Sequence, residues 1–433
     1  MNQYSRRGFL GLAGAAGIAG LAACAGTGGS PSTNATGGGG AGTGTIEFWS
    51  NHPGNSKEVE QKIIKAFEAA NSGLKVKLVD AGKNYEEVQQ KFNAALAGGQ
   101  LPDVVVVSDV TWFNFALNKQ LAPLDDMVSQ AGIKIDDYVD ALYNDYKLND
   151  KHFALPYSRS TPLFYYNKEM WKAAGLEDRG PKDWDEFKAW APKIKAAVGD
   201  KAVIVLPDGT NYLDWVFQNI AWSFGGAFSK EWTPTASDPA TIEAGKFLQD
   251  LAKSGYLKVA KDASPEFTAG LAACSLMSTG SLGGVTKDAK FEFGTAFLPG
   301  DGNCPTGGAG VGIAAGIDDA RKKNALKFIE FLTNPDNTVT FTQATGYMPV
   351  RKSAVDLPAE KEFLDKNPNA KTAIEQLPHT RSQDNARVLV PGGGLRIGKA
   401  LDQIVAGQDV ATVFAALDKE TQSVIDAQIK PKL

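Results

Sequence analysis

The sequence has few of the residues on which most hydrolytic and redox sites are built. It contains three histidines and three cysteines, no C-x-x-C pair, no H-E-x-x-H zinc motif and no G-x-S-x-G nucleophile elbow. The glycine-rich stretch 307–316 matches neither a P-loop nor a dinucleotide-binding fingerprint. These absences predict a protein that is not an enzyme and that holds no cofactor and no metal. Carboxylates are abundant and no pair stands out, so a secreted hydrolase of the glycosidase type stays open as a distant rival.

Charge of one sign and cysteine pairs are also scarce. The chain has 45 Lys and Arg against 49 Asp and Glu, a net charge of −4, and no basic run. Because nucleic-acid-binding proteins carry basic patches, nucleic acid is not expected as a partner. Beyond residue 24 the remaining cysteines are Cys274 and Cys304. They could pair in an oxidising compartment, but the sequence cannot show that their Cα atoms come within disulfide distance.

The N-terminus has the pattern of an export signal. Residues 5–10 (SRRGFL) give a basic start with two adjacent arginines, an uncharged Ala/Gly/Leu-rich run follows, and LAAC ends at Cys24. We expect a twin-arginine, lipoprotein-type signal peptide over 1–23 and a lipid on Cys24. The alternative is an ordinary signal peptide in which Cys24 is only a small apolar residue.

The lipidated cysteine opens a predicted tether over 24–44. Residues 25–44 are almost only Gly, Ala, Ser and Thr, a composition that stays a flexible coil with a root-mean-square span of about 25 Å. The protein is therefore expected outside the cytoplasm, held by its lipid alone on the outer face of the cytoplasmic membrane.

The first part of the body, residues 45–158, alternates strand and helix patterns. Asn55 with Glu58, and Asn84 with Glu87, have the spacing of capping boxes ahead of two amphipathic helices. The predicted strands cover 46–49, 76–79 and 103–107. This β-α-β-α-β order predicts a largely parallel α/β sheet, and such sheets bind ligands at the carboxyl ends of their strands.

The rest of the chain predicts a second, more helical lobe, because the body is too long for one core. Residues 153–168 form an extended stretch whose prolines break helix formation, and we expect a hinge near 158–162. The predicted first lobe comprises 45–158 and 310–347, and the predicted second lobe comprises 163–305 and 352–433.

Several motifs resemble a known family. The extended crossover that ends in YYNK (165–168) resembles that of the extracellular solute-binding proteins of ABC importers (family 1), a family that includes maltose-binding protein. Further motifs are similar to the branch, in its actinobacterial form, that binds sn-glycerol-3-phosphate and glycerophosphodiesters. These motifs are AGKNY (81–85), STP (160–162), TGSL (279–282), GGA (307–309), TGYMPV (345–350), LPHTR (377–381) and RVLVPGG (387–393). The resemblance implies a two-lobed periplasmic-binding-protein-like α/β fold, a monomer, and a small-molecule phosphate ester delivered to ABC permease transmembrane subunits.

The resemblance also implies how the phosphate is held. Arg387 would supply a bidentate guanidinium, and the Gly308 N–H could approach closely because glycine has no side chain. Ser160, Ser278 and Tyr347 would add hydroxyl groups. Without the resemblance, an arginine in a helical tail is usually a solvated charge. Ser281 is nearly as plausible a ligand as Ser278.

The other ligand groups implied by the resemblance are aromatic and acidic. Tyr85 and Asp109 would take the glycerol hydroxyls, and Tyr212 with Trp215 would wall the opposite side. Each has a structural alternative. Tyr85 could be only the first residue of its helix, Asp109 an N-cap for a helix at 111–117, and Tyr212 and Trp215 core aromatics at i, i+3 spacing.

Two departures from the family pattern bear on the ligand. Relatives tuned to free glycerol phosphate have Trp in place of Tyr212 and Glu in place of Asp109, so both side chains are shorter here and leave room for a head group. Aromatic rings and a carboxylate suit a quaternary ammonium, so glycerophosphocholine is the leading ligand and sn-glycerol-3-phosphate the second. The alternative is an oligosaccharide, which needs stacking aromatics but no arginine. Ligand groups from both lobes imply hinge closure on binding.

Overall fold

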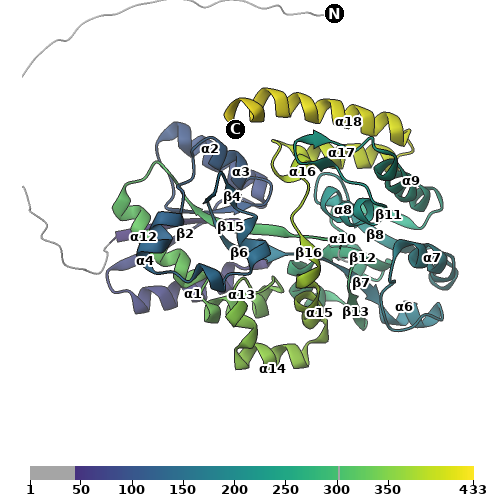
Figure 1. The fold of residues 1–433 in the computed structure, drawn as a ribbon. Coiled ribbons are helices and arrows are strands. Elements are labelled where there is room, and N and C mark those ends of the chain that lie inside the picture. The colour runs from purple at the N-terminus through teal and green to yellow at the C-terminus, as the bar shows by residue number, and fades with distance from the viewer. Residues whose placement is uncertain (1–43, 301–302) are drawn as a thin grey trace, which may run out of the picture. The chain divides into compact units, whose positions relative to one another are not determined.

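Two five-stranded sheets carry the fold (Figure 1). The computed structural model describes residues 44–300 and 303–433. The predicted signal peptide, the predicted lipidation site at Cys24 and almost all of the predicted tether lie outside these residues. No helix within the two described ranges is long and apolar enough to cross a bilayer.

The first sheet has the strand order β2-β1-β3-β15-β6. Strands β1, β2 and β3 run parallel, and β15 lies antiparallel between β3 and β6. The three strands predicted at the start of the body are all present. The bounds are β1 (Gly44–Ser50), β2 (Leu74–Asp80), β3 (Val104–Ser108), β6 (Leu155–Ser160) and β15 (Gly307–Ile313).

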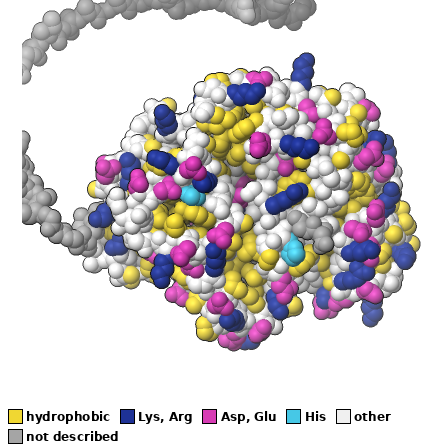
Figure 2. All heavy atoms as spheres, viewed as in Figure 1, with side chains coloured by type: hydrophobic (Ala, Val, Ile, Leu, Met, Phe, Trp, Pro, Cys, Tyr) yellow, Lys and Arg dark blue, Asp and Glu magenta, His cyan; other side chains and the backbone are white. Residues whose placement is uncertain are grey.

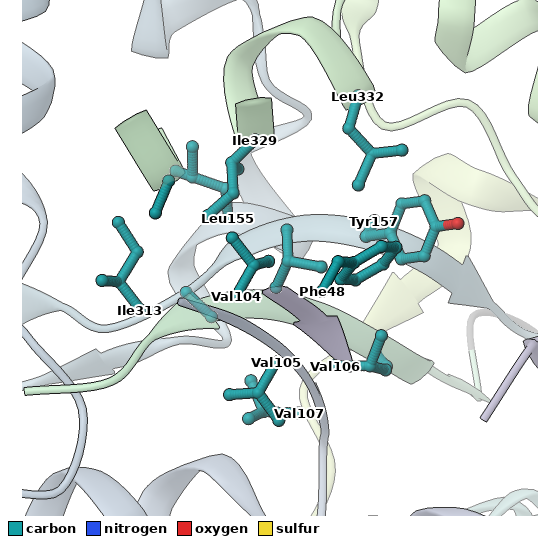
Figure 3. Close-up of a cluster of buried hydrophobic side chains, with 14 of the residues drawn as sticks. Phe48, Val104, Val105, Val106, Val107, Leu155, Tyr157, Ile313, Ile329 and Leu332 are labelled. Atoms are coloured by element: carbon teal, nitrogen blue, oxygen red, sulfur yellow. The ribbon is translucent and has the colours of Figure 1, made fainter. Parts of the chain in front are cut away.

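Strand β3 lies in the middle of this sheet, and Val104–Val107 are buried throughout. Successive side chains of a strand point to opposite faces. In Figure 3, Val105 and Val107 accordingly lie on the opposite side of the strand from Phe48 and Ile329. A continuous apolar run is stable here because helices cover both faces, and each buried valine contributes about 1.5–3 kcal/mol relative to exposure.

Helices pack on both faces of the first sheet, and we call these elements together the first lobe. They include α1 (Lys57–Ala70), α2 (Tyr85–Gly98), α3 (Trp112–Leu117), α4 (Asp125–Ala131), α5 (Asp140–Asn144), α12 (Asp319–Leu332) and α13 (Pro335–Thr345). Short hairpin strands β4 (Lys147–Leu148) and β5 (Lys151–His152) complete it.

Of the two predicted capping boxes, the structure has the one at Asn84 and lacks the one at Asn55. Asn84 caps α2 as predicted, because its Oδ1 accepts the Glu87 N–H at 2.9 Å. The capping box predicted at Asn55 is wrong. Asn55 belongs to a short 3₁₀ turn and has a left-handed φ of 59°, whereas Ser56 occupies the position before α1. An N-cap residue needs an extended backbone, which the left-handed turn does not give Asn55.

The second sheet has the order β11-β8-β12-β7-β13. Strand β12 runs parallel to β8 and antiparallel to β7, so this sheet is mixed. Its bounds are β7 (Pro162–Asn167), β8 (Ala202–Pro207), β11 (Leu257–Ala260), β12 (Ala272–Ser278) and β13 (Phe293–Ala296).

Helices around the second sheet complete what we call the second lobe. They are α6 (Lys168–Ala173), α7 (Trp184–Val198), α8 (Leu213–Ser223), α9 (Pro239–Lys253), α10 (Ala263–Thr268), α11 (Leu282–Asp288), α15 (Pro368–Gln376), α16 (Asn385–Val388), α17 (Gly393–Val405) and α18 (Val410–Val424). Helix α14 (Pro358–Lys366) contacts both α13 and α15. Strands β9 (Ser229–Lys230) and β10 (Thr233–Pro234) form a small hairpin.

Strands β6 and β7 connect the lobes and meet at Thr161. The extended crossover was predicted, but the predicted hinge at 158–162 is mostly strand, with Thr161 alone between the two strands. Thr161 is fully buried, its carbonyl accepts the Thr279 N–H at 2.9 Å, and its hydroxyl accepts Gln376 Nε2 at 3.1 Å. A second connection pairs β14 (Cys304–Pro305) with β16 (Thr380–Arg381).

The two cysteines of the body are free, so the disulfide that the sequence left open is absent from the structure. Cys274 lies in β12 and its thiol donates to the Val203 carbonyl at 3.1 Å, whereas Cys304 lies in β14 next to the Pro162 carbonyl. Burial raises the pKa of both thiols. Each thiol is therefore packed as a small apolar group and is poor in the reactive thiolate form.

The C-terminal residues return to the first lobe. Helix α18 contacts α9 and α17 of the second lobe, and Figure 1 shows it running toward the C-terminus near α2. Ile429 is fully buried in the core of the first lobe, and Lys432 Nζ donates to Asn118 Oδ1 at 2.6 Å. The chain end thus connects the lobes in addition to the crossover at Thr161, the β14–β15 segment and helix α14.

The surface carries mixed charge. In Figure 2, Lys and Arg side chains alternate with Asp and Glu over the visible face, and neither sign forms a large patch there. Over residues 44–300 and 303–433, no group of three or more His, Cys, Asp and Glu side chains is placed to hold a metal ion.

Candidate functional site

Arg387 lies at the centre of a buried polar cluster. Its Nε donates to Asp214 Oδ2 at 2.6 Å, and its Nη1 donates to Asp109 Oδ2 at 3.2 Å. Nη1 also donates to the side-chain oxygen of Gln383, whose amide donates to Asp109 Oδ2. Arg387 is 7% exposed, so its neighbours rather than water balance its charge. The alternative of a solvated arginine is therefore wrong.

Both lobes contribute to this cluster. Asp109 follows β3 of the first sheet, and its N–H donates to the Gly308 carbonyl of β15 at 2.9 Å. Asp214 lies in the first turn of α8, and Arg387 lies in α16. The Arg387–Asp214 pair therefore stays within the second lobe, whereas the Arg387–Asp109 contact joins the two lobes.

The cluster holds more negative than positive charge. Burial raises the pKa of Asp214 to about 6; Arg387 lowers this pKa and Asp109 adds to the rise. Burial opposes the charge of Arg387, but Asp214 and Asp109 hold its pKa above the usual value. The guanidinium is thus permanently charged, and two carboxylates share it.

Tyrosine hydroxyls lie beside the cluster. Burial raises the pKa of Tyr85, and Tyr347 and Asp109 lie close enough to raise it further. Burial also raises the pKa of Tyr347 to about 12, and it raises the pKa of Tyr212 well above its usual value. Within the described part of the chain, the Tyr85 hydroxyl and Ser158 Oγ are buried, lie beside each other, and make no hydrogen bond of normal geometry. Buried polar atoms are normally paired, so these hydroxyls are suited to a ligand's polar groups.

Trp215 packs against the crossover. Its Nε1 donates to the Thr306 carbonyl at 2.9 Å, and a Cβ on Gly307 would lie 2.4 Å from its Cζ2 atom. The Tyr212 ring stands edge-on to it, with centroids 6.0 Å apart. Trp215 also belongs to the second-lobe core, which agrees with the core-aromatic alternative for its packing.

The predicted serines lie where strands reach the crossover. Ser160 ends β6 and Ser278 ends β12. Ser278 Oγ accepts the Gly280 N–H at 3.1 Å, and a Cβ on Gly280 would lie 2.7 Å from Tyr347 Cζ. The Ser281 hydroxyl lies instead beside Tyr212 and lowers that tyrosine's pKa. Tyr347 thus lies beside both the turn that follows Ser278 and Tyr85, whereas Ser160 is near the cluster through the pairing of β6 with β15.

The structure also tests the structural alternatives for Asp109 and Tyr85. The residue before α3 is Thr111, so Asp109 does not cap that helix. Tyr85 is the first residue of α2, as its alternative has it, and its hydroxyl nevertheless lies in the cluster. A helix start and a ligand position are compatible, because the side chain of the first residue points away from the helix body toward the carboxyl ends of the strands.

Sequence reasoning missed Asp214 and Gln383. Asp214 stands in the apolar helix start LDWVF (213–217), where a buried carboxylate needs a partner. Gln383 lies two residues before α16, so the i, i+4 rule for helices does not apply to its contact with Arg387. Only the signal at Asp214 was present in the sequence.

A comparison with known families agrees with this architecture. Residues 62–372, most of the chain, match the family described as bacterial extracellular solute-binding protein. The chain belongs to this family. Because its members bind a solute, the prediction that this extracellular solute-binding protein is not an enzyme is confirmed.

Two relatives are similar over nearly the whole solute-binding protein. The sn-glycerol-3-phosphate-binding periplasmic protein UgpB of Escherichia coli K12 is 28% identical, covering 89% of this chain and 91% of the relative. The crystal structure of UgpB from Mycobacterium tuberculosis in complex with glycerophosphocholine is 50% identical, with a TM-score of 0.87, and covers 90% of this chain and 100% of that one.

More distant structures share the fold alone. The GacH receptor of Streptomyces glaucescens is 21% identical with a TM-score of 0.77, covering 89% of this chain and 99% of that one. The sugar-binding protein MalE of Xanthomonas citri is 21% identical with a TM-score of 0.73, covering 88% of this chain and 98% of that one. The predicted two-lobed periplasmic-binding-protein fold is therefore confirmed.

Proposed function

We propose that this solute-binding protein captures glycerophosphodiesters, above all glycerophosphocholine, and delivers them to the transmembrane subunits of an ABC importer. Its second ligand is sn-glycerol-3-phosphate. The observation that carries the proposal is the buried Arg387, which donates to Asp109 of the first lobe at the junction of the lobes. The likeness of this chain to a relative that was crystallised with glycerophosphocholine supports the same ligand.

Arg387 suits a phosphate because its planar guanidinium can donate to two oxygens at once. In the structure its Nη1 is engaged by Asp109 and Gln383. A phosphodiester would replace Asp109 as acceptor, and the freed carboxylate would then accept glycerol hydroxyls or attract a quaternary ammonium. The unpaired hydroxyls of Tyr85 and Ser158 would pair with the rest of the ligand. A neutral oligosaccharide has no anionic group that could replace Asp109 as the acceptor for Arg387.

Binding is expected to favour closure of the lobes. Asp109 and Tyr85 come from the first lobe, and Arg387 and Tyr212 come from the second. A ligand that contacts all of them binds the closed arrangement better, and it shifts the population by that difference in affinity. The closed form is the one that would dock on the permease.

The head-group wall gives one prediction. We expect Tyr212→Trp to weaken glycerophosphocholine by roughly ten- to a hundredfold, because overpacking a rigid pocket costs about 1–3 kcal/mol. The affinity for sn-glycerol-3-phosphate should stay equal or rise, since this ligand has no head group. Calorimetric titration of both ligands measures the difference, and an equal loss for both would mean that Tyr212 only packs the lobe.

The location gives a second prediction. We propose a lipid on Cys24, so Cys24→Ala should release the protein into the medium or leave an uncleaved precursor, because one thiol carries the anchor. Fractionation of cells followed by immunoblotting measures this. Unchanged membrane association of the variant would contradict the lipid anchor, and the Cys274→Ala variant serves as the control because that thiol is buried in β12.

A further inference from the structure

The charges around Arg387 do not balance. Two carboxylates, Asp109 and Asp214, contact one guanidinium. The neighbouring cation Arg159 does not correct this excess, because it is paired with Asp145. The site therefore carries a surplus negative charge before any anionic ligand arrives, which is unexpected for a protein that captures phosphate esters.

The two carboxylates differ in whether a ligand can take their place beside Arg387. Asp109 belongs to the first lobe and separates from Arg387 when the lobes open. Asp214 lies in the same lobe as Arg387, and its side chain is 3% exposed. Helix α17 closes over it, because a Cβ on Gly394 would lie 2.8 Å from Asp214 Oδ2. Asp214 is thus covered by α17 and paired with Arg387 inside one lobe, so opening of the lobes would leave its charge beside Arg387.

We propose that Asp214 is a positioning residue that makes the site prefer a singly charged phosphodiester to a doubly charged phosphate monoester. The inference rests on the proposed function and names the feature that separates its two ligands. Asp214 holds the guanidinium through Nε, and at the same time it repels whatever anion binds to the rest of that group.

Coulomb repulsion from Asp214 scales with the ligand's charge. A phosphate monoester has a second pKa of about 6 and is a dianion above it, whereas a diester keeps a single negative charge near neutral pH. The dianion therefore meets about twice the repulsion from Asp214 in a site with little water to screen it. Its attraction to Arg387 doubles as well, so the preference for the diester comes from the sum of one guanidinium and two carboxylates, Asp109 and Asp214. Burial is the main cause of the raised pKa of Asp214, and the nearby carboxylate of Asp109 adds to the rise.

The test compares sn-glycerol-3-phosphate with its methyl diester, which has one charge less and no ammonium group. We expect the wild-type protein, titrated calorimetrically near pH 8, to bind the diester roughly tenfold or more tightly than the monoester. Asp214→Asn should shrink this ratio about fivefold or more, because it keeps the shape and removes the charge. Asp214→Glu should keep the wild-type ratio.

The matched control is Asp402→Asn. Asp402 is another carboxylate of the second lobe; its Oδ1 accepts the Gly209 N–H at 2.9 Å and it does not contact Arg387. This variant should keep the wild-type ratio. If Asp214→Asn does not fold, Asp214→Ser removes the same charge and leaves room for a water.

The outcomes separate the two proposals. A wild-type ratio near one, or a ratio that Asp214→Asn leaves unchanged, overturns the role of Asp214 while the binding of phosphate esters stands. Failure of the wild-type protein to bind either ester or glycerophosphocholine overturns the proposed function, and the role of Asp214 with it.

Discussion

Replacing Arg387 with alanine is expected to weaken the binding of glycerophosphocholine by roughly thirtyfold to a few thousandfold. This range corresponds to about 2–5 kcal/mol, the usual cost of truncating one partner of a buried charge pair. The phosphate loses its main donor, and Asp214, which is 2% exposed, keeps a buried charge without its partner. Calorimetric titration measures the affinity, and circular dichroism at the same temperature shows whether the variant is folded.

Two variants make the result specific. Arg387→Lys keeps the charge but loses the planar fork, so it should restore only part of the affinity. Arg381→Ala is the matched control, because the Arg381 guanidinium lies 3.7 Å from the centroid of the Trp222 ring and not on the carboxylates. Wild-type affinity in Arg387→Ala would place the phosphate elsewhere.

The second large effect is expected at Gly308, on the stability of the first lobe. Its φ is 88°, and an added Cβ would lie 2.1 Å from the Ser158 carbonyl oxygen on the neighbouring strand. A left-handed backbone costs an alanine about 1 kcal/mol or more, and the clash with backbone atoms adds to it. Gly308→Ala should therefore lower the free energy of unfolding by about 2–4 kcal/mol, measured by urea denaturation.

A second glycine serves as the control that separates backbone strain and steric clash at Gly308 from a general effect of replacing glycine with alanine. Gly284 in α11 has open space around its would-be Cβ and no positive φ. Gly284→Ala should leave the stability unchanged or raise it by a few tenths of a kcal/mol up to about 1 kcal/mol. Equal stability of the Gly308→Ala variant and the wild-type protein would contradict the close approach of β15 and β6.

Local sequence patterns predict the start of the body well. The unbroken valine run of β3 requires a strand covered on both faces, and the side chain of Asn84 caps α2 as its spacing to Glu87 indicates. Asn55 has the same spacing to an acidic residue but sits in a left-handed turn. The difference comes from the chain path between β1 and α1, which residue spacing does not encode.

Long-range pairing accounts for what the sequence could not show. The insertion of β15 between β3 and β6 joins segments about 150 to 200 residues apart, and no local pattern specifies it. The return of Ile429 to the first lobe is of the same kind. In both cases the partners are far apart in the sequence, so their contact is visible only in the folded structure.

The candidate site divides in a similar way. Arg387 has no distinguishing local pattern, and only the family resemblance pointed to it. Its ion pair with Asp214 joins residues 173 positions apart, so the sequence shows neither the partner nor the burial. Gln383 was also missed, because it lies before α16 and no helix spacing rule connects it to Arg387.

Calorimetric titration of the purified protein with glycerophosphocholine, in the presence and absence of excess maltose, tests the central claim most directly. We expect saturable binding with one ligand per protein, no competition by maltose, and recovery of glycerophosphocholine unchanged after hours of incubation. Competition by maltose-type sugars without binding of the phosphodiester would contradict the account in favour of a sugar-binding protein, and hydrolysis of the ligand would contradict it in favour of an enzyme.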